Sequence, residues 1–177
     1  MRKVLYIFGL LTDADVAWMA RTGNRRWLDD GEVVIREGED TNFLIFLLEG
    51  EFSVSAEGFG EVARMGVGEI VGEISLVDSA PPAATIMARG RCRALFLDKA
   101  RLLRKMDDDE GFGSRFYRAL AVFLADRLRG TRKPEQAGIA DVTAILKDEL
   151  DEGILDRISD AGERFQRMLK VLSGAAP

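Results

Sequence analysis

Between residues 27 and 98 the sequence alternates short apolar segments with breaks rich in glycine and acidic residues. The segments are five or six residues long and recur at intervals of roughly 8–12 residues, which is typical of a β-sandwich or barrel and not of alternating strands and helices. They are Glu32–Arg36, Phe43–Leu48, Glu51–Ser55, Glu61–Met65, Ala84–Ala88 and Arg93–Leu97. The pattern therefore predicts a β-domain in this part of the chain.

Helical patterns flank this region on both sides. Thr12 or Asp13 can cap a short helix that ends near Gly23, because small polar side chains accept hydrogen bonds from the first N–H groups of a helix. Lys99–Met106 fits a second short helix, and residues 114–129 carry apolar side chains at three- and four-residue steps, which predicts an amphipathic helix. We expect residues 1–130 to form one α+β domain.

The C-terminal segment, residues 135–177, reads as a separate helical tail. It holds nine acidic and five basic residues, and its apolar side chains step by three and four, as on one stripe of a helix. The spacing leaves three alternatives open: packing on the chain's own β-domain, self-association, or docking on a protein partner. We expect association with a second copy of the chain.

Composition excludes several classes of function. The chain has no histidine and a single cysteine, Cys92, which excludes a Ser-His-Asp triad, a His-ligated metal and an intrachain disulfide. The net charge of −5 argues against a free-standing DNA-binding protein. No apolar run approaches the ~20 residues of a membrane span, and no clean signal-peptide cleavage site follows residues 4–11. We expect a cytoplasmic protein without catalytic or metal-binding residues.

Residues 68–86 form the most informative segment. Gly72 permits a tight turn, Glu73 opens a stretch that can make one or two helical turns, and small residues follow at Ala80, Ala83 and Ala84. Pro81-Pro82 keeps the chain extended before the next strand. Small side chains expose backbone N–H groups, so the segment predicts an anion-binding concavity with one carboxylate beside it.

The order and spacing of these motifs resemble the cyclic-nucleotide-binding domain of the catabolite activator protein, kinase regulatory subunits and cyclic-nucleotide-gated channels. The resemblance covers residues 8–130. It rests on Phe8-Gly9-Leu10-Leu11-Thr12-Asp13-Ala14-Asp15, on Gly31-Glu32-Val33-Val34-Ile35-Arg36-Glu37-Gly38, on Phe46-Leu47-Leu48-Glu49-Gly50, and on the cassette Gly72-Glu73-Ile74-Ser75-Leu76 with Ala83-Ala84-Thr85 following it.

The resemblance implies a β-jelly roll flanked by helices, with cyclic AMP, in preference to cyclic GMP, inside the roll. It implies that Glu73 binds the ribose 2′-hydroxyl, that Ser75 lies near the phosphate, and that backbone groups of Gly72, Ile74 and Ala83 line the ribose phosphate. The helix at 114–129 corresponds to the family's C-helix, which implies a homodimer and closure over the purine. No covalent cofactor is implied. The full ligand-binding set is Val71, Gly72, Glu73, Ile74, Ser75, Pro82, Ala83 and Ala84.

Pro82 departs from the family pattern, which places an arginine at this position to neutralise the phosphate. Loss of one partner of a buried charge pair costs about 2–5 kcal/mol. Either Arg36, Arg64 or Arg89 reaches the pocket instead, or the fold serves as a dimerisation or protein-interaction module without a nucleotide. The acidic tail also lacks the basic recognition helix of the family's transcription factors, so we expect no DNA binding.

Overall fold

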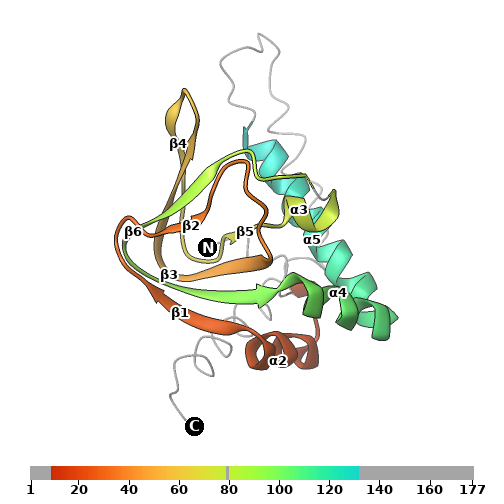
Figure 1. Cartoon of the computed structure of the whole chain (residues 1–177). Helices are drawn as coiled ribbons and strands as arrows, with labels where there is room; N and C mark the ends of the chain where they lie inside the picture. The colour runs from red at the N-terminus through yellow and green to blue at the C-terminus, as the bar shows by residue number, and fades with distance from the viewer. Residues whose placement is uncertain (1–8, 79, 132–177) are drawn as a thin grey trace, which may run out of the picture.

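A computed structural model describes residues 9–78 and 80–131, so the predicted tail at 135–177 lies outside the described residues. A β-roll occupies one side of the molecule and the helices gather at its other end (Figure 1). The elements are α2 (Asp13–Thr22), β1 (Asn24–Leu28), β2 (Val33–Ile35), β3 (Phe43–Ala56), β4 (Gly60–Met65), β5 (Ile70–Val71), α3 (Ile74–Val77), β6 (Thr85–Asp98), α4 (Lys99–Asp108) and α5 (Glu110–Thr131).

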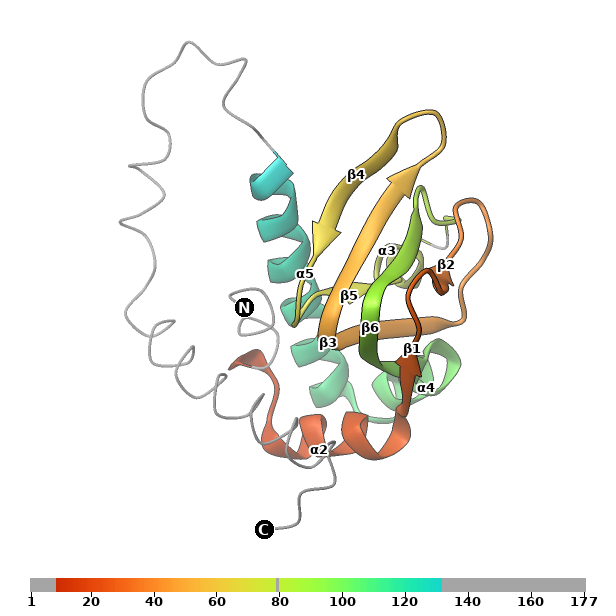
Figure 2. The same cartoon turned by 90° about the vertical axis from the view of Figure 1, so that its left-hand side faces the viewer.

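Two long strands, β3 and β6, form the centre of the sheet. They pair antiparallel along their length, with β1 and β2 on the far side of β6 and with β4 and β5 on the far side of β3. The resulting antiparallel sheet with flanking helices confirms the predicted jelly-roll class (Figure 2).

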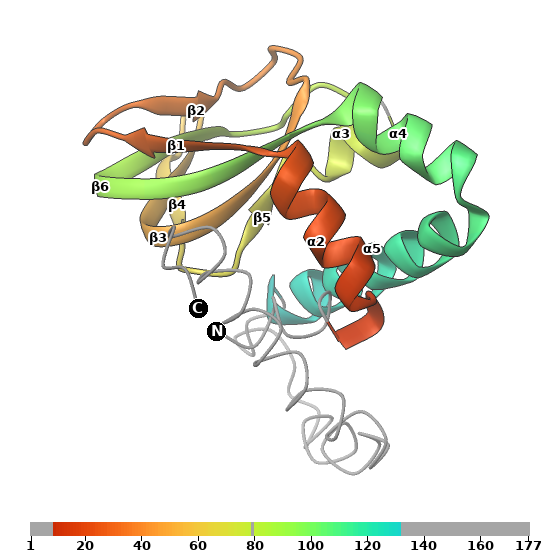
Figure 3. The same cartoon turned by 90° about the horizontal axis from the view of Figure 1, so that it is seen from below.

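Alternation along β3 divides the core in two. Leu44, Phe46 and Leu48 pack toward the helices, in a cluster with apolar side chains of α2, α4 and α5. Ile45 and Leu47 point into the roll. Residues two apart on a strand share a face, so one strand with both faces buried joins the helical layer to the interior of the roll. Figure 3 shows the helices on one side of the strands.

The sequence prediction split β3 and β6 at positions where the chain is in fact continuous. Gly50 lies inside β3 with a φ of +91°, and the pairing with β6 shifts register on both sides of Glu49. A β-carbon at Gly50 would lie 2.6 Å from the Sγ atom of Cys92, so glycine is needed at this bulge. β1 was missed altogether, because Asn24 to Trp27 are all exposed and show no apolar alternation.

The helices follow their predicted positions. Thr12 and Asp15 form a reciprocal capping box at the start of α2, and Gly23 ends it. Phe116, Leu120 and Phe123 of α5 are buried against the chain's own core, whereas Leu128 on the same helix is 71% exposed. The homodimer itself stays a prediction. No helix in the described part of the chain is long and apolar enough to cross a membrane.

Candidate functional site

The segment between β5 and β6 forms a tight loop above the roll. Gly72 adopts a φ of +82°, and a β-carbon there would lie 2.5 Å from the carbonyl oxygen of Phe43. Glycine therefore lets the chain turn closely over β3. After Glu73 the chain makes the single four-residue turn of α3, Ile74–Val77, within the one or two turns that the sequence allowed.

A cavity of about 190 Å³ opens beneath this loop. All eight residues of the predicted ligand-binding set line it, so the two arms of the cassette converge as the sequence indicated. Their role in binding a ligand stays a prediction. The remaining wall is apolar apart from one arginine of α5, and consists of Ile35, Val54, Met65, Ile86 and Arg127.

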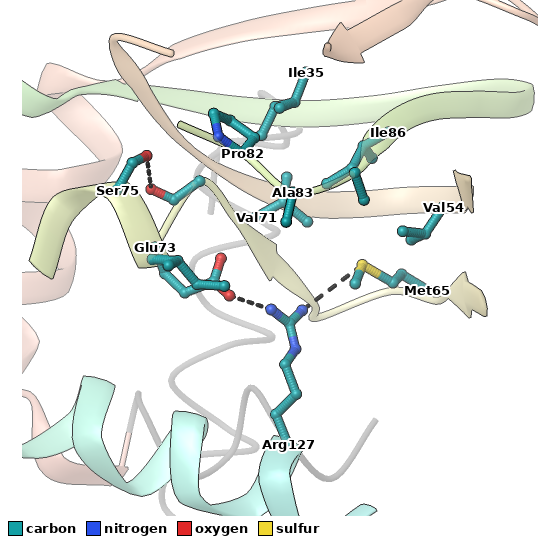
Figure 4. Close-up of a pocket in the computed structure, with 13 residues that line it drawn as sticks. Ile35, Val54, Met65, Val71, Glu73, Ser75, Pro82, Ala83, Ile86 and Arg127 are labelled. Carbon is teal, nitrogen blue, oxygen red and sulfur yellow. Dashed lines mark hydrogen bonds and ion pairs between the residues drawn. The ribbon is translucent and has the colours of Figure 1, made fainter. Parts of the chain in front are cut away.

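Glu73 and Arg127 form an ion pair at the centre of this site (Figure 4). The Glu73 side chain is 2% exposed. The Arg127 guanidinium also donates 3.1 Å to the carbonyl oxygen of Ile70, and lies 3.6 Å from a carboxylate oxygen of Glu69. One side chain of α5 thus reaches over the pocket and contacts the cassette and the strand before it.

Burial raises the pKa of Glu73 above its ordinary value, while the positive charge of Arg127 acts in the opposite direction. Each hydrogen-bond donor that reaches the Glu73 carboxylate stabilises its charged form. One partner alone does not offset the free energy lost when the carboxylate is removed from water. Chemically the site offers one hydrogen-bond-accepting carboxylate, Glu73, in a mostly apolar cavity that Ser75 and Arg127 also line.

A further charged side chain, Lys99, lies behind the cassette. Lys99, at the start of α4, is 8% exposed. Its ammonium donates 2.6 Å to the hydroxyl oxygen of Ser75 and 2.8 Å to the carbonyl oxygen of Thr41. Burial lowers the pKa of this amine, against the raising effect of the charges on Glu73 and Asp40. Sequence reasoning missed Lys99, whose only signal was its place directly after β6.

None of the three arginines considered as replacements for the missing phosphate ligand lines the cavity. Arg36 lies 3.6 Å from Glu39, and Arg64 and Arg89 lie 2.7 and 3.4 Å from Glu61, all with side chains about half exposed. Among the described residues, Arg127 is the arginine that lines the pocket, and in the sequence it is one polar residue of the predicted helix at 114–129. Pro82 lines the cavity with its ring, while its carbonyl accepts 2.8 Å from the N–H of Gly38.

Comparison with known proteins shows which family this part of the chain resembles. Residues 25–109 match the family model described as the cyclic nucleotide-binding domain. A protein from Rhodopseudomonas palustris, named "Putative potassium channel protein", is 36% identical over 98 residues, which are 54% of this chain and 24% of that protein. The chain therefore spans about a quarter of the length of this curated relative.

Solved structures share the fold at low identity. A cyclic nucleotide-binding domain from Methylobacillus flagellatus is 21% identical, with a TM-score of 0.64 over 72% of this chain and 78% of that one. The regulatory subunit of a cAMP-independent protein kinase A from Trypanosoma brucei is 20% identical, with a TM-score of 0.54 over 72% of this chain and 42% of that one. Residues 25–109 thus match the model of the cyclic nucleotide-binding domain, and the solved structures share its fold.

Proposed function

We propose that this chain is a non-enzymatic regulatory module that binds cyclic AMP, in preference to cyclic GMP, in the cavity beneath the cassette. The observation that carries the proposal is the buried carboxylate of Glu73, which projects into an apolar cavity lined by both arms of the cassette. A ribose 2′-hydroxyl is a suitable donor for such a carboxylate, and hydrogen bonds to charged groups are the stronger ones.

The preference for adenine rests on the cavity wall. Ile35, Val54 and Ile86 offer no side-chain donor or acceptor to a purine edge. Guanine carries an exocyclic carbonyl and an amino group, and burial of these groups without partners costs free energy. Adenine has fewer polar groups to leave unpaired against the same wall.

Arg127 would couple ligand binding to a change in the position of α5. The cavity is smaller than the ~300–1,000 Å³ usual for ligand pockets, and the Arg127 side chain forms part of its lining. A nucleotide that enters and donates to Glu73 therefore shifts Arg127, and with it the helix α5 that carries this side chain. The ligand would change the position of α5, which is the output expected of a regulatory domain.

Calorimetric titration with cyclic AMP, cyclic GMP and 2′-deoxy cyclic AMP tests this proposal. We expect wild type to bind cyclic AMP most tightly, and Glu73→Gln to weaken it by about 10- to 100-fold, the value of a charge-assisted hydrogen bond. The 2′-deoxy ligand lacks the hydroxyl, so the same variant should change its affinity little. Equal losses for both ligands would contradict the assignment of Glu73 to the 2′-hydroxyl.

A second candidate function is an interaction module without a nucleotide. Pro82 in place of a charged residue and the existing Glu73–Arg127 pair favour it. The related fold in Trypanosoma brucei belongs to a kinase described as cAMP-independent. Absence of heat with all three ligands, from a folded protein, would support this candidate against the first.

A further inference from the structure

Lys99 is a buried cation without an anionic partner in the described part of the chain. Its two hydrogen-bond acceptors, a carbonyl and a hydroxyl, are both neutral. No carboxylate among the described residues lies within ion-pair distance of it. Charges are seldom buried without a counter-charge, because the loss of hydration is large. The negative charges on Glu73 and Asp40 act on the Lys99 amine only from beyond ion-pair distance, so a direct anionic partner is missing at this end of the cavity.

Ser75 connects Lys99 to the pocket. The Ser75 hydroxyl oxygen accepts from Lys99, which leaves its own O–H free to donate, and Ser75 lines the cavity. Its present acceptor is the carbonyl oxygen of Gly72 at 3.5 Å, a long contact that a better acceptor would replace (Figure 4). A donor hydroxyl held by a cation is polarised toward an anion.

We propose that Lys99, acting through Ser75, makes this end of the cavity the anion-binding end, and so supplies the positive charge that Pro82 does not. Lys99 is a positioning residue, and Ser75 is the group that contacts the ligand's anionic oxygen. Two parts of the ligand are then bound at two places: Glu73 accepts a hydrogen bond from a hydroxyl, and the Lys99–Ser75 pair binds the phosphate. This inference rests on the proposed nucleotide pocket.

The first test compares a charged and an uncharged ligand. Lys99→Met and Ser75→Ala are titrated with cyclic AMP and with adenosine, which lacks the phosphate. We expect each variant to weaken the binding of cyclic AMP about tenfold and that of adenosine less than twofold, because only the phosphate of cyclic AMP contacts the Lys99–Ser75 pair. The double variant should lose little more than either single one, since both changes interrupt the same path. Lys105→Met removes the same charge from α4 at a position that pairs with Asp109 and does not line the cavity, and it serves as a control.

Equal weakening of both ligands would overturn the inference, because it would assign Lys99 to support of the loop alone. Lys99→Gln keeps a donor to Ser75 without the charge, so recovery of cyclic AMP affinity by this variant would also count against it. Thermal unfolding of each variant shows whether the fold has survived.

Titration with inorganic phosphate separates this inference from the proposed function. If wild type binds no cyclic nucleotide, the proposed function fails. Stabilisation of wild type by phosphate over chloride, lost in Lys99→Met and in Ser75→Ala but kept in Lys105→Met, would still support an anion site. No such stabilisation, together with no nucleotide binding, would overturn both.

Discussion

Arg115 in α5 donates hydrogen bonds of 2.7 and 2.9 Å to the two carboxylate oxygens of Asp15 in α2. The same carboxylate accepts from the backbone N–H of Thr12 at 2.8 Å, so it caps its own helix and joins the first described helix to the last. Asp15 is 4% exposed. This bidentate contact orients α5, the helix that carries Arg127 to the pocket.

Asp15 should make the stability of the domain sensitive to acid. Burial raises its pKa, but hydrogen bonds from Arg115 and Thr12 outweigh burial and leave the pKa below the usual 3.8. A lowered pKa in the folded state gives stability that is present above pH ~4 and is lost as pH falls through the folded value. Asp15→Asn should therefore cost about 1–2 kcal/mol at pH 7 and progressively less below pH 4.

Urea unfolding of wild type and Asp15→Asn between pH 2.5 and 7 measures this difference. Asp107→Asn, on the surface of α4, controls for the loss of any acid. A gap between wild type and Asp15→Asn that is constant over the whole range would contradict the prediction.

Glu73 and Arg127 should be energetically coupled. Arg127→Met leaves the Glu73 carboxylate buried without its guanidinium partner, and we expect a loss of about 1–3 kcal/mol in the free energy of unfolding. Glu73→Gln should cost less, since the amide oxygen still accepts a hydrogen bond and no charge is buried. The double variant should be more stable than the sum of the two losses predicts, by about 1 kcal/mol in a double-mutant cycle. Strict additivity would show that the pair makes no contribution.

Pro82→Arg should tighten the binding of cyclic AMP. An arginine at the phosphate end of the cavity adds a charge-assisted contact worth about 1.5–3 kcal/mol, or roughly 10- to 150-fold in affinity. The hydrogen bond from Gly38 uses the backbone carbonyl and is kept. Pro82→Ala is the matched control for removal of the proline ring, and calorimetry measures the affinity of both variants for cyclic AMP. Unchanged affinity in Pro82→Arg, with the fold intact, would mean that the ligand has no anionic group at this wall.

Gly72→Ala should destabilise the domain by about 2–4 kcal/mol. The positive φ is unfavourable for alanine, and the new methyl group would lie 2.5 Å from a backbone carbonyl oxygen that cannot move freely. Gly58→Ala shares a positive φ, +78°, but meets nothing within 4 Å, so it should cost only about 1 kcal/mol. Chemical denaturation compares the two, and equal losses would show that the close approach to β3 is unimportant.

The sequence predicted local features well, since capping residues, strand-like segments and the small residues of the cassette act over a few positions. It failed where structure depends on distant contacts. Gly50 looks like a break but is a bulge, because only the pairing with β6 keeps the strand going there. Arg127 looks like any polar residue on a helix, and nothing local shows that α5 crosses the pocket mouth. Lys99 was missed for the same reason, since burial of a lysine depends on the elements packed around it.

The position of Arg127 determines which fragment ends keep the site of this domain complete. The stretch that matches the family model, residues 25–109, contains both arms of the cassette and Lys99, but it stops before α5 and begins after α2. A fragment trimmed to those ends would keep the floor and rim of the cavity, and would lose the guanidinium over Glu73 together with the Asp15–Arg115 contact. The minimal expression unit for any binding study therefore runs from Thr12 to at least Arg127, and swaps with related domains should exchange both flanking helices along with the roll.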